Sequence, residues 1–496
     1  MNRNSLTTAV IAGIAGVAGI ANMASAVNLN PDGLGQVLLY PYYTVNGGQS
    51  TLLSVVNTTA VGKAVKVRFL EGYNSREVLD FNLFLSPFDV WTADIFALSD
   101  FIGASAGDGA AIFTRDNSCT APVLSEGTFA NGVGYVAFRD YTFSGTNSDT
   151  GPTDISRTRE GHFEMISMGN IVAGSALDDD TTHDHGVPPG CGTAGNNPTP
   201  AEADFEANDA VVAPTSGLFG SAEVVDTANG TYYTYNADAI NGFTATAIIS
   251  PTNNLTPNLA QANDPASTDA TSYVFDEAGN VLTSTYTSSN AIDAVSSIFM
   301  SENVYNEYVA SASGNGTDWV LNFPTKRFYV DATINSSAPI QPFEHAFGAE
   351  ETGNALGLSC TVIGITIYDR EENTSTPSGC GFSPCPPGQP PSSLCHETNV
   401  ITFNSTGTNS ILSSTLTANI KPIGTSGWAG LNMDPPATGH TLRAATNLNV
   451  FHGLPVSGFA AVNFVVGSGT ATFGNYSGVN RHRIDRLCTN SGGACS

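Results

Sequence analysis

The sequence predicts an all-β protein built from two or three antiparallel β-sandwich domains, with long polar loops and at most one or two short helices. The prediction depends on the stretch 50–95, in which apolar side chains recur at every second position. Alternation with this period is typical of strands. Turn-forming residues interrupt the pattern at intervals of about ten residues, as in sandwich folds. No apolar stripe with helical spacing is present in this stretch.

Four strands are expected in this stretch, at 51–56, 64–70, 79–85 and 88–95. In the second, apolar residues alternate with Lys66 and Arg68, so one face is apolar and the other is expected to face solvent. Pro87 ends the third strand, because proline lacks the amide that a central strand needs. The pattern therefore predicts a β-meander with one solvent-exposed face.

Two further elements carry specific expectations. Gln36–Val45 is expected to be an edge strand, since Pro41 lies within it. Ser289–Tyr308 is the one expected helix, with Asn290 as its N-cap and an apolar face. Additional strands are expected at 110–115, 133–143, 162–168, 218–226, 231–236, 273–275, 281–286, 318–331, 361–368, 400–404, 410–420, 446–451 and 458–466.

The chain begins with the features of a secretory signal. Arg3 supplies a positive charge, the apolar run 9–20 is too short to span a bilayer, and Ala24-Ser25-Ala26 forms an A-x-A cleavage site. The predicted organisation is a signal peptide (1–26), an N-terminal β-sandwich domain (27–175), an acidic polar loop or linker (176–210), a hairpin-rich region with one helix (211–345) and a C-terminal cysteine-containing β domain (346–496).

The charge balance is strongly acidic, with 17 lysines and arginines against 44 acids and a net charge of −27. This balance excludes a nucleic-acid partner, because phosphate contacts need clustered cations. It also disfavours docking to anionic lipid, and it suits either solubility or cation binding. No apolar run of eighteen residues follows the leader, so no transmembrane segment is expected in the mature chain.

Eight cysteines in an exported chain predict disulfides. They are Cys119, Cys191, Cys360, Cys380, Cys385, Cys395, Cys488 and Cys495. Spacing suggests the pairs Cys488–Cys495 and Cys119–Cys191, and leaves the other four to pair among themselves. The alternative is a zinc site at Cys380, Cys385, Cys395 and His396, although its spacing is not that of a standard zinc knuckle.

The metal candidates lie together in the acidic linker, at Asp178, Asp180, His183 and His185. Calcium would use the carboxylates, and zinc or nickel would use the imidazoles. The alternative interpretation is a solvated acidic loop without any ion. No other cofactor is expected.

Three more groups could carry function. The basic cluster Arg481-His482-Arg483 with Arg486 could bind an anionic polysaccharide or the acidic face of a neighbouring subunit, or form internal salt bridges. The tyrosines at 40, 42 and 43 and at 232, 233 and 235 could stack on sugars, or could pack in the core. Glu344-His345 and Glu350-Glu351 could form an acid/base group, but no catalytic motif supports an enzyme.

The strand and turn pattern of 50–95 resembles immunoglobulin-like modules of bacterial surface proteins, and a jelly-roll-like arrangement of the sandwiches is the other expectation. The resemblance covers a small part of the chain and implies no functional residues. The first hypothesis is an exported structural or adhesive protein of the bacterial cell surface, which could self-assemble by pairing the edge strand Gln36–Val45. The alternative is a secreted carbohydrate-binding or carbohydrate-active protein. The expected partners are the protein itself or cell-surface polysaccharide, and the expected location is extracellular, at the outer cell surface or in the periplasm.

Overall fold

The computed structural model confirms the predicted all-β class, with 47% of residues in strands and 12% in helices. It describes residues 26–103, 107–124, 128–130, 133–192, 199–207, 210–252, 254–262, 269–276, 279–310, 315–334, 341–348, 358–375, 393–403, 410–420, 422–436, 438–468 and 471–495. The signal-peptide residues 1–25 and the candidate residues Glu350, Glu351, Cys380 and Cys385 lie outside the described residues.

The largest sheet has ten strands in the order β17-β16-β1-β15-β2-β11-β4-β5-β8, with β12 paired to β11. Its strands are β1 (Ala26–Leu29), β2 (Val37–Thr44), β4 (Lys63–Glu71), β5 (Glu77–Leu85), β8 (Cys119–Ala121), β11 (Glu160–Ile171), β12 (Val211–Val212), β15 (Asp238–Asn241), β16 (Ala270–Phe275) and β17 (Val281–Tyr286).

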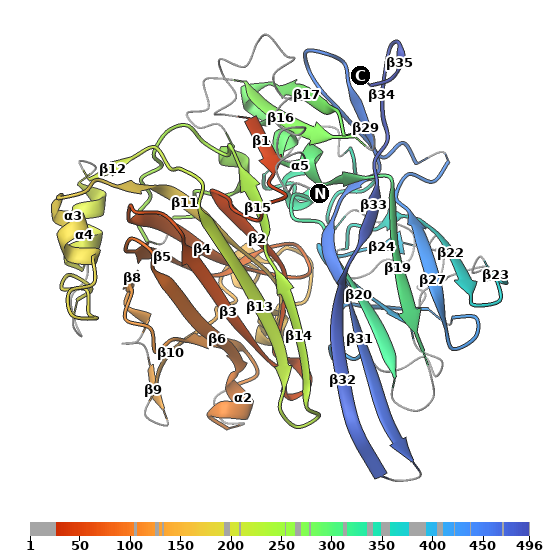
Figure 1. The fold of residues 1–496 in the computed structure, drawn as a ribbon, viewed down its shortest axis with the longest axis horizontal. Coiled ribbons are helices and arrows are strands. Elements are labelled where there is room, and N and C mark those ends of the chain that lie inside the picture. Colours follow the sequence, from red (N-terminus) through yellow and green to blue (C-terminus); the bar gives the residue numbers. More distant parts are fainter. Residues whose placement is uncertain are drawn as a thin grey trace, which may run out of the picture.

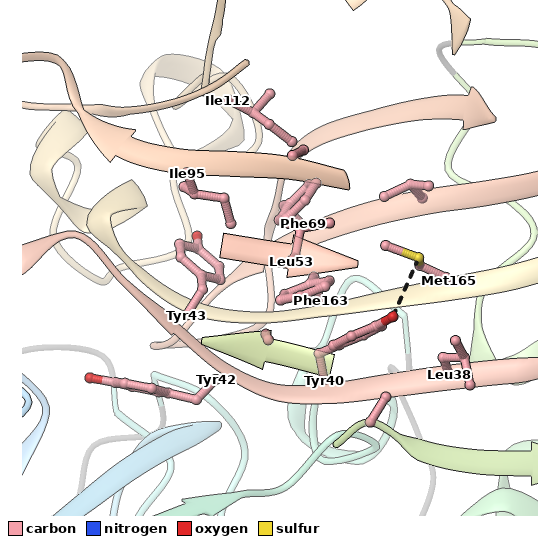
Figure 2. Close-up of a cluster of buried hydrophobic side chains, with 14 of the residues drawn as sticks. Leu38, Tyr40, Tyr42, Tyr43, Leu53, Phe69, Ile95, Ile112, Phe163 and Met165 are labelled. Atoms are coloured by element: carbon pink, nitrogen blue, oxygen red, sulfur yellow. Dashed lines mark hydrogen bonds between the residues drawn. The ribbon is translucent and has the colours of Figure 1, made fainter. Parts of the chain in front are cut away.

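A seven-stranded sheet packs on this one, in the order β14-β13-β3-β6-β7-β10-β9. Its strands are β3 (Ser50–Asn57), β6 (Val90–Ala97), β7 (Ala110–Phe113), β9 (Thr128–Ala130), β10 (Val133–Ala137), β13 (Leu218–Asp226) and β14 (Thr231–Asn236). The two sheets enclose the first core (Figure 2), in which Tyr40 stacks on Phe163 at 4.1 Å and its hydroxyl reaches the sulfur of Met165. The predicted strands of 50–95 are therefore β3 to β6, and their apolar faces line this core.

A second sandwich lies on the other side of the molecule (Figure 1), formed by two five-stranded sheets in the orders β23-β22-β27-β19-β33 and β26-β25-β20-β31-β32. The first has β19 (Asn303–Val309), β22 (Gly364–Asp369), β23 (Thr374–Ser375), β27 (Ser426–Asn432) and β33 (Arg483–Asp485). The second has β20 (Gly316–Asn322), β25 (Thr398–Phe403), β26 (Thr417–Ile420), β31 (Ser457–Ser468) and β32 (Ala471–Arg481).

Short elements complete the described part of the chain. The small sheets contain β18 (Met300–Ser301), β21 (Thr361–Val362), β24 (Ser393–Leu394), β28 (Thr441–Arg443), β29 (Val450–His452), β30 (Leu454–Pro455), β34 (Cys488–Asn490) and β35 (Gly493–Ala494). The five short helices are α2 (Leu98–Phe101), α3 (Ala176–Thr181), α4 (Pro200–Glu206), α5 (Ile292–Phe299) and α6 (Arg327–Val330). The 3₁₀ turns are η2 (Asn46–Gly48), η5 (Gly145–Asn147), η6 (Ile155–Arg159), η7 (Leu259–Gln261) and η8 (Ser288–Asn290).

Expectations about three single elements are wrong. The strand expected over 318–331 ends at Asn322, and Arg327–Val330 form the helix α6. The helix expected over Ser289–Tyr308 ends at Phe299, and its second half is strand, because β19 pairs with β27 and buries alternate residues. The edge strand expected at Gln36–Val45 is instead an inner strand, β2, which has β11 on one side and β15 on the other. Pro41 is tolerated because it lies at a register shift and beyond the last pair with β15.

The face of β4 that was expected to be exposed to solvent is buried. Lys66 pairs with Asp80, and Arg68 pairs with Glu77 and Glu164. The helices α3 and α4 pack on the adjoining part of this face. Both helices belong to the stretch 176–210, which was predicted to be a polar linker. Burying charges requires partners, and each of these two cations has at least one carboxylate within contact distance.

The sheets also cross the predicted domain borders. Strands β13 and β14, from the stretch 211–345, continue the sheet that contains β3 and β6. The two sandwiches share an apolar contact in which Phe459 of β31 stacks on Tyr235 at 4.6 Å. Within the described ranges, no helix is long and apolar enough to cross a membrane.

Candidate functional site

The four metal candidates make separate contacts. Asp178, in the first turn of α3, accepts hydrogen bonds from the Gly174 amide before the helix and from the Thr182 hydroxyl at its end. His183 Nδ1 lies 2.7 Å from the Ser86 hydroxyl, and His185 is 94% exposed beside Asp184. Burial and Asp204 raise the pKa of Asp180. Across the described residues, no three histidines, cysteines or acids are arranged to hold a metal ion.

Three disulfides are present in the described residues, and they include the two pairs that spacing suggested. Cys119–Cys191 ties β8 to the segment after α3, and Cys488–Cys495 closes the C-terminal tail. Cys360 pairs with Cys395. His396 is half-buried, its ring lies edge-on to Tyr73 with centroids 4.8 Å apart, and desolvation lowers its pKa to about 3.

The tyrosine groups belong mainly to the core. The tyrosines of β2 are fully buried, and one of them, Tyr42, donates its hydroxyl hydrogen bond to Glu160 at 2.8 Å. In β14 the side chains alternate, so Tyr233 and Tyr235 are buried while Tyr232 is 49% exposed. The core interpretation of these tyrosines therefore holds for all but Tyr232.

In the acid/base candidate Glu344-His345, the charge of His345 acts on the Glu344 carboxylate. This carboxylate also accepts a hydrogen bond from the Val362 amide at 2.6 Å. It also lies 3.6 Å from Nε2 of His440, a residue distant in sequence. Burial tends to raise the pKa of Glu344, but its hydrogen bonds and His440 outweigh burial and leave the pKa lowered.

The basic cluster divides between interior and surface. His482 is buried, its Nε2 lies 3.0 Å from the Val320 carbonyl oxygen, and burial lowers its pKa to about 4. Arg486 donates to the carbonyl oxygens of Ile298 and Met300, and burial lowers its pKa to about 10. Arg481 and Arg483 point outward, as the alternation along a strand requires.

A buried charge cluster joins the two sandwiches, and it was missed in the sequence because its members lie far apart in the chain. The loop after β4 begins beyond Glu71, which Arg157 contacts through two nitrogens, and Arg157 also holds Asp149. The backbone of the same loop receives hydrogen bonds from Glu397 and Thr398 of the second sandwich. Arg157 and Glu71 are closed to solvent, so this cluster is a structural joint.

The exposed face of the β22-β27-β19 sheet carries the candidate site. Register places Glu307, Trp428 and Tyr368 in one row across the three strands, on the face that points away from the second core. The indole of Trp428 stacks on Tyr368 with centroids 4.4 Å apart and an interplanar angle of 12°. Trp428 is nevertheless 43% exposed, so part of its ring remains open to a ligand.

The next row contains Gly430 and Tyr305, with Arg483 of β33 beside them. A side chain at Gly430 would meet the Tyr305 ring, because an added Cβ would lie 3.1 Å from its Cε1 atom. Glycine therefore lets the Tyr305 ring lie over the strand. The Tyr305 and Trp428 centroids are 6.3 Å apart with their planes tilted by 57°.

These rows border a hollow of about 300 Å³, which we call the aromatic hollow. It is lined by Tyr305, Asn306, Glu307, Trp428, Asn480, Arg481 and Arg483. Arg481 contacts Asp238 at 3.0 Å, and Arg483 donates to the Arg481 carbonyl oxygen. Aromatic faces beside amide, carboxylate and guanidinium groups can stack on the apolar face of a sugar ring and hydrogen-bond its hydroxyls.

The sequence held a weak signal for this hollow. The run Gly427-Trp428-Ala429-Gly430 places a large indole among small neighbours in a strand. The signal is not specific, since the opposing Tyr305 and Tyr368 are placed only by strand register. No protein family, curated protein or solved structure matches the chain, so the geometry is the basis for a function.

Proposed function

We propose that the protein is an exported adhesive protein of the bacterial cell surface that binds saccharides at the aromatic hollow. This proposal combines adhesion with the carbohydrate-binding alternative. The three disulfides support an oxidising location outside the cytoplasm. Pairing between subunits through Gln36–Val45 is not part of the proposal, because β2 already has a neighbour on each side.

The exposed indole of Trp428 is the observation that carries the proposal. Large aromatic side chains are normally buried, and an exposed one that borders a hollow is typical of a recognition site. Glu307 and Asn306 add acceptors, and Arg483 adds donors with no carboxylate partner among the described residues. Recognition would therefore combine stacking with several hydrogen bonds to hydroxyl groups.

Binding of the full chain to a panel of immobilised polysaccharides and glycans tests the proposal. Trp428→Ala should weaken binding about tenfold or more, which corresponds to about 1.4 kcal/mol. Phe219→Ala is a matched control, because Phe219 is also 43% exposed but lies on β13 of the seven-stranded sheet. Failure to retain any saccharide, or equal losses in both variants, would rule out this site. Cell fractionation of the native protein tests the surface location separately.

A further inference from the structure

A second hollow, of about 650 Å³, lies where the β4–β5 loop meets α6 and η5. We call it the basic hollow, and define it by the three arginines that line it, Arg76, Arg139 and Arg327. The whole chain has only 17 lysines and arginines against 44 acids, so three cations in one hollow reverse the local sign of charge. It shares no lining residue with the aromatic hollow.

Two of the arginines are fixed in place by one carboxylate. Asp331 accepts from Nε of Arg327 at 3.1 Å and lies 3.0 Å from Nη2 of Arg76. Arg327 also donates to the Ser75 carbonyl oxygen at 2.9 Å. Burial and the neighbouring Arg76 lower the pKa of Arg327. Arg76 Nε also lies 3.5 Å from Asp149, which Arg157 holds as well. Neither Asp149 nor Asp331 lines the hollow, so the counter-ions of these two guanidinium groups lie behind its wall.

The third arginine is open to solvent. Arg139 is exposed, and its side chain has no carboxylate partner among the residues that the structure describes. The single carboxylate in the lining, Glu77, is already held by Arg68 through Nε at 2.7 Å. Arg68 also pairs with the buried Glu164, behind the lining. The lining itself therefore carries three guanidinium groups and one carboxylate, and Arg68 is shared between that carboxylate and Glu164.

The rest of the lining is rich in hydrogen-bonding groups. Thr146 and Ser148 contribute hydroxyls, and the phenol of Tyr141 is 73% exposed at the rim. Guanidinium groups bind carboxylate, sulfate and phosphate with two parallel hydrogen bonds where geometry permits. Hydroxyls next to such an anion site suit a ligand that carries hydroxyl groups of its own.

We propose that the basic hollow binds a compact oxyanion ligand, in which a carboxylate, sulfate or phosphate group on a hydroxyl-bearing carrier is held by Arg76, Arg139 and Arg327. The site does not depend on the proposed function, because it uses different residues on different elements. A ligand there would contact both the first sandwich, through Arg139, and α6 of the second part of the chain, through Arg327.

Calorimetric titration of the full chain with galacturonate, glucose 6-phosphate, inorganic sulfate and neutral galactose tests this inference. In the Trp428→Ala variant, which lacks the stacking ring of the aromatic hollow, at least one of the three anions should bind saturably and galactose should not. Added salt should weaken the anion binding. Arg139→Gln should reduce the affinity about fivefold or more, while Arg139→Lys retains part of it. Arg139 is exposed, and its side chain forms no ion pair with another described residue, so its variants should keep the wild-type unfolding midpoint.

Arg115→Gln is the matched control, since Arg115 is also an exposed arginine but lines a hollow on the seven-stranded sheet. The affinity of the Arg115→Gln variant for the anions should equal that of the wild-type protein. The inference is overturned if no anion binds saturably, if galactose binds the Trp428→Ala variant as tightly as the best of the anions, or if Arg139→Gln and Arg115→Gln change the affinity to the same extent.

Discussion

The guanidinium of Arg157 holds the carboxylate of Glu71 at two points, with Nε 2.7 Å from Oε2 and Nη2 2.9 Å from Oε1. Arg157 belongs to η6 and Glu71 is the last residue of β4, and both are closed to solvent. The remaining Glu71 acceptor capacity is used by the backbone amides of Tyr73, Asn74 and Arg76. This one contact therefore fixes the shape of the loop that meets the second sandwich.

Arg157→Ala should destabilise the protein by about 3–5 kcal/mol, because it leaves the carboxylates of Glu71 and Asp149 buried without their main partner. The urea unfolding midpoint measures the change. Arg159→Ala is the control, since Arg159 donates only to the Val45 carbonyl oxygen and leaves no buried charge behind. A loss of about 1 kcal/mol is expected there. Equal losses would mean that the ion pair is not the source of the effect.

The buried histidines predict how stability depends on pH. Burial, followed by the charge of Arg68, lowers the pKa of His162 to about 3. An unfolded histidine titrates near pH 6.5, so below that pH the unfolded chain binds a proton that the folded chain does not. The stabilisation is complete above pH 6.5 and is lost as the pH falls towards 3, by about 1.4 kcal/mol per pH unit.

His162→Gln should therefore lose less stability between pH 7 and pH 5 than the unchanged protein, by about 2 kcal/mol. Urea unfolding at the two pH values measures the difference. His185→Gln is the control, because His185 is 94% exposed and its substitution leaves the buried His162 in place. The half-buried His396 and the buried His482 also have lowered pKa values, so a weaker acid dependence remains after one substitution. An unchanged dependence in His162→Gln would show that this ring is protonated in the folded state.

The meander of 50–95 could be predicted because strand alternation is a local property. Val67 and Trp91 face the core as their period-two positions require. The burial of Lys66 and Arg68 could not be predicted in the same way. It depends on partners on other strands and on α3 and α4, which come from more than a hundred residues further along the chain.

The candidate site could also be predicted only in part, because its residues are brought together by strand pairing. Trp428 and Tyr368 lie 60 residues apart in sequence and become neighbours only through the register of β22 with β27. Arg481 and Arg483 were recognised as part of a basic cluster, but only the strand pairing shows that they point outward while His482 points inward. The sequence shows which residue types are present, but it does not show which of these side chains lie on the same face of the sheet.

The disulfides should contribute unequally to stability. Cys119–Cys191 closes a separation of 72 residues and Cys488–Cys495 closes one of 7. On the chain-entropy argument, removal should cost about 4 kcal/mol for the long loop and about 2.5 kcal/mol for the short one. Paired cysteine-to-alanine variants and urea unfolding measure both costs. The long-loop variant should also be cleaved faster within 176–210 by protease, because this bond anchors the segment after α3. Equal proteolysis of both variants would contradict the anchoring.

Gly430 should control the shape of the aromatic hollow without controlling the fold. A Cβ there would lie 3.1 and 3.2 Å from two Tyr305 ring atoms and 3.7 Å from Cζ3 of Trp428, so Gly430→Val must displace the Tyr305 ring. Valine suits a strand, so the unfolding midpoint should change little while saccharide binding falls about fivefold or more. Gly478→Val is the control, because a Cβ at Gly478 on β32 meets no atom within 4 Å. If Gly430→Val binds saccharide as tightly as the Gly478 variant, the ligand does not enter the hollow between Tyr305 and Trp428.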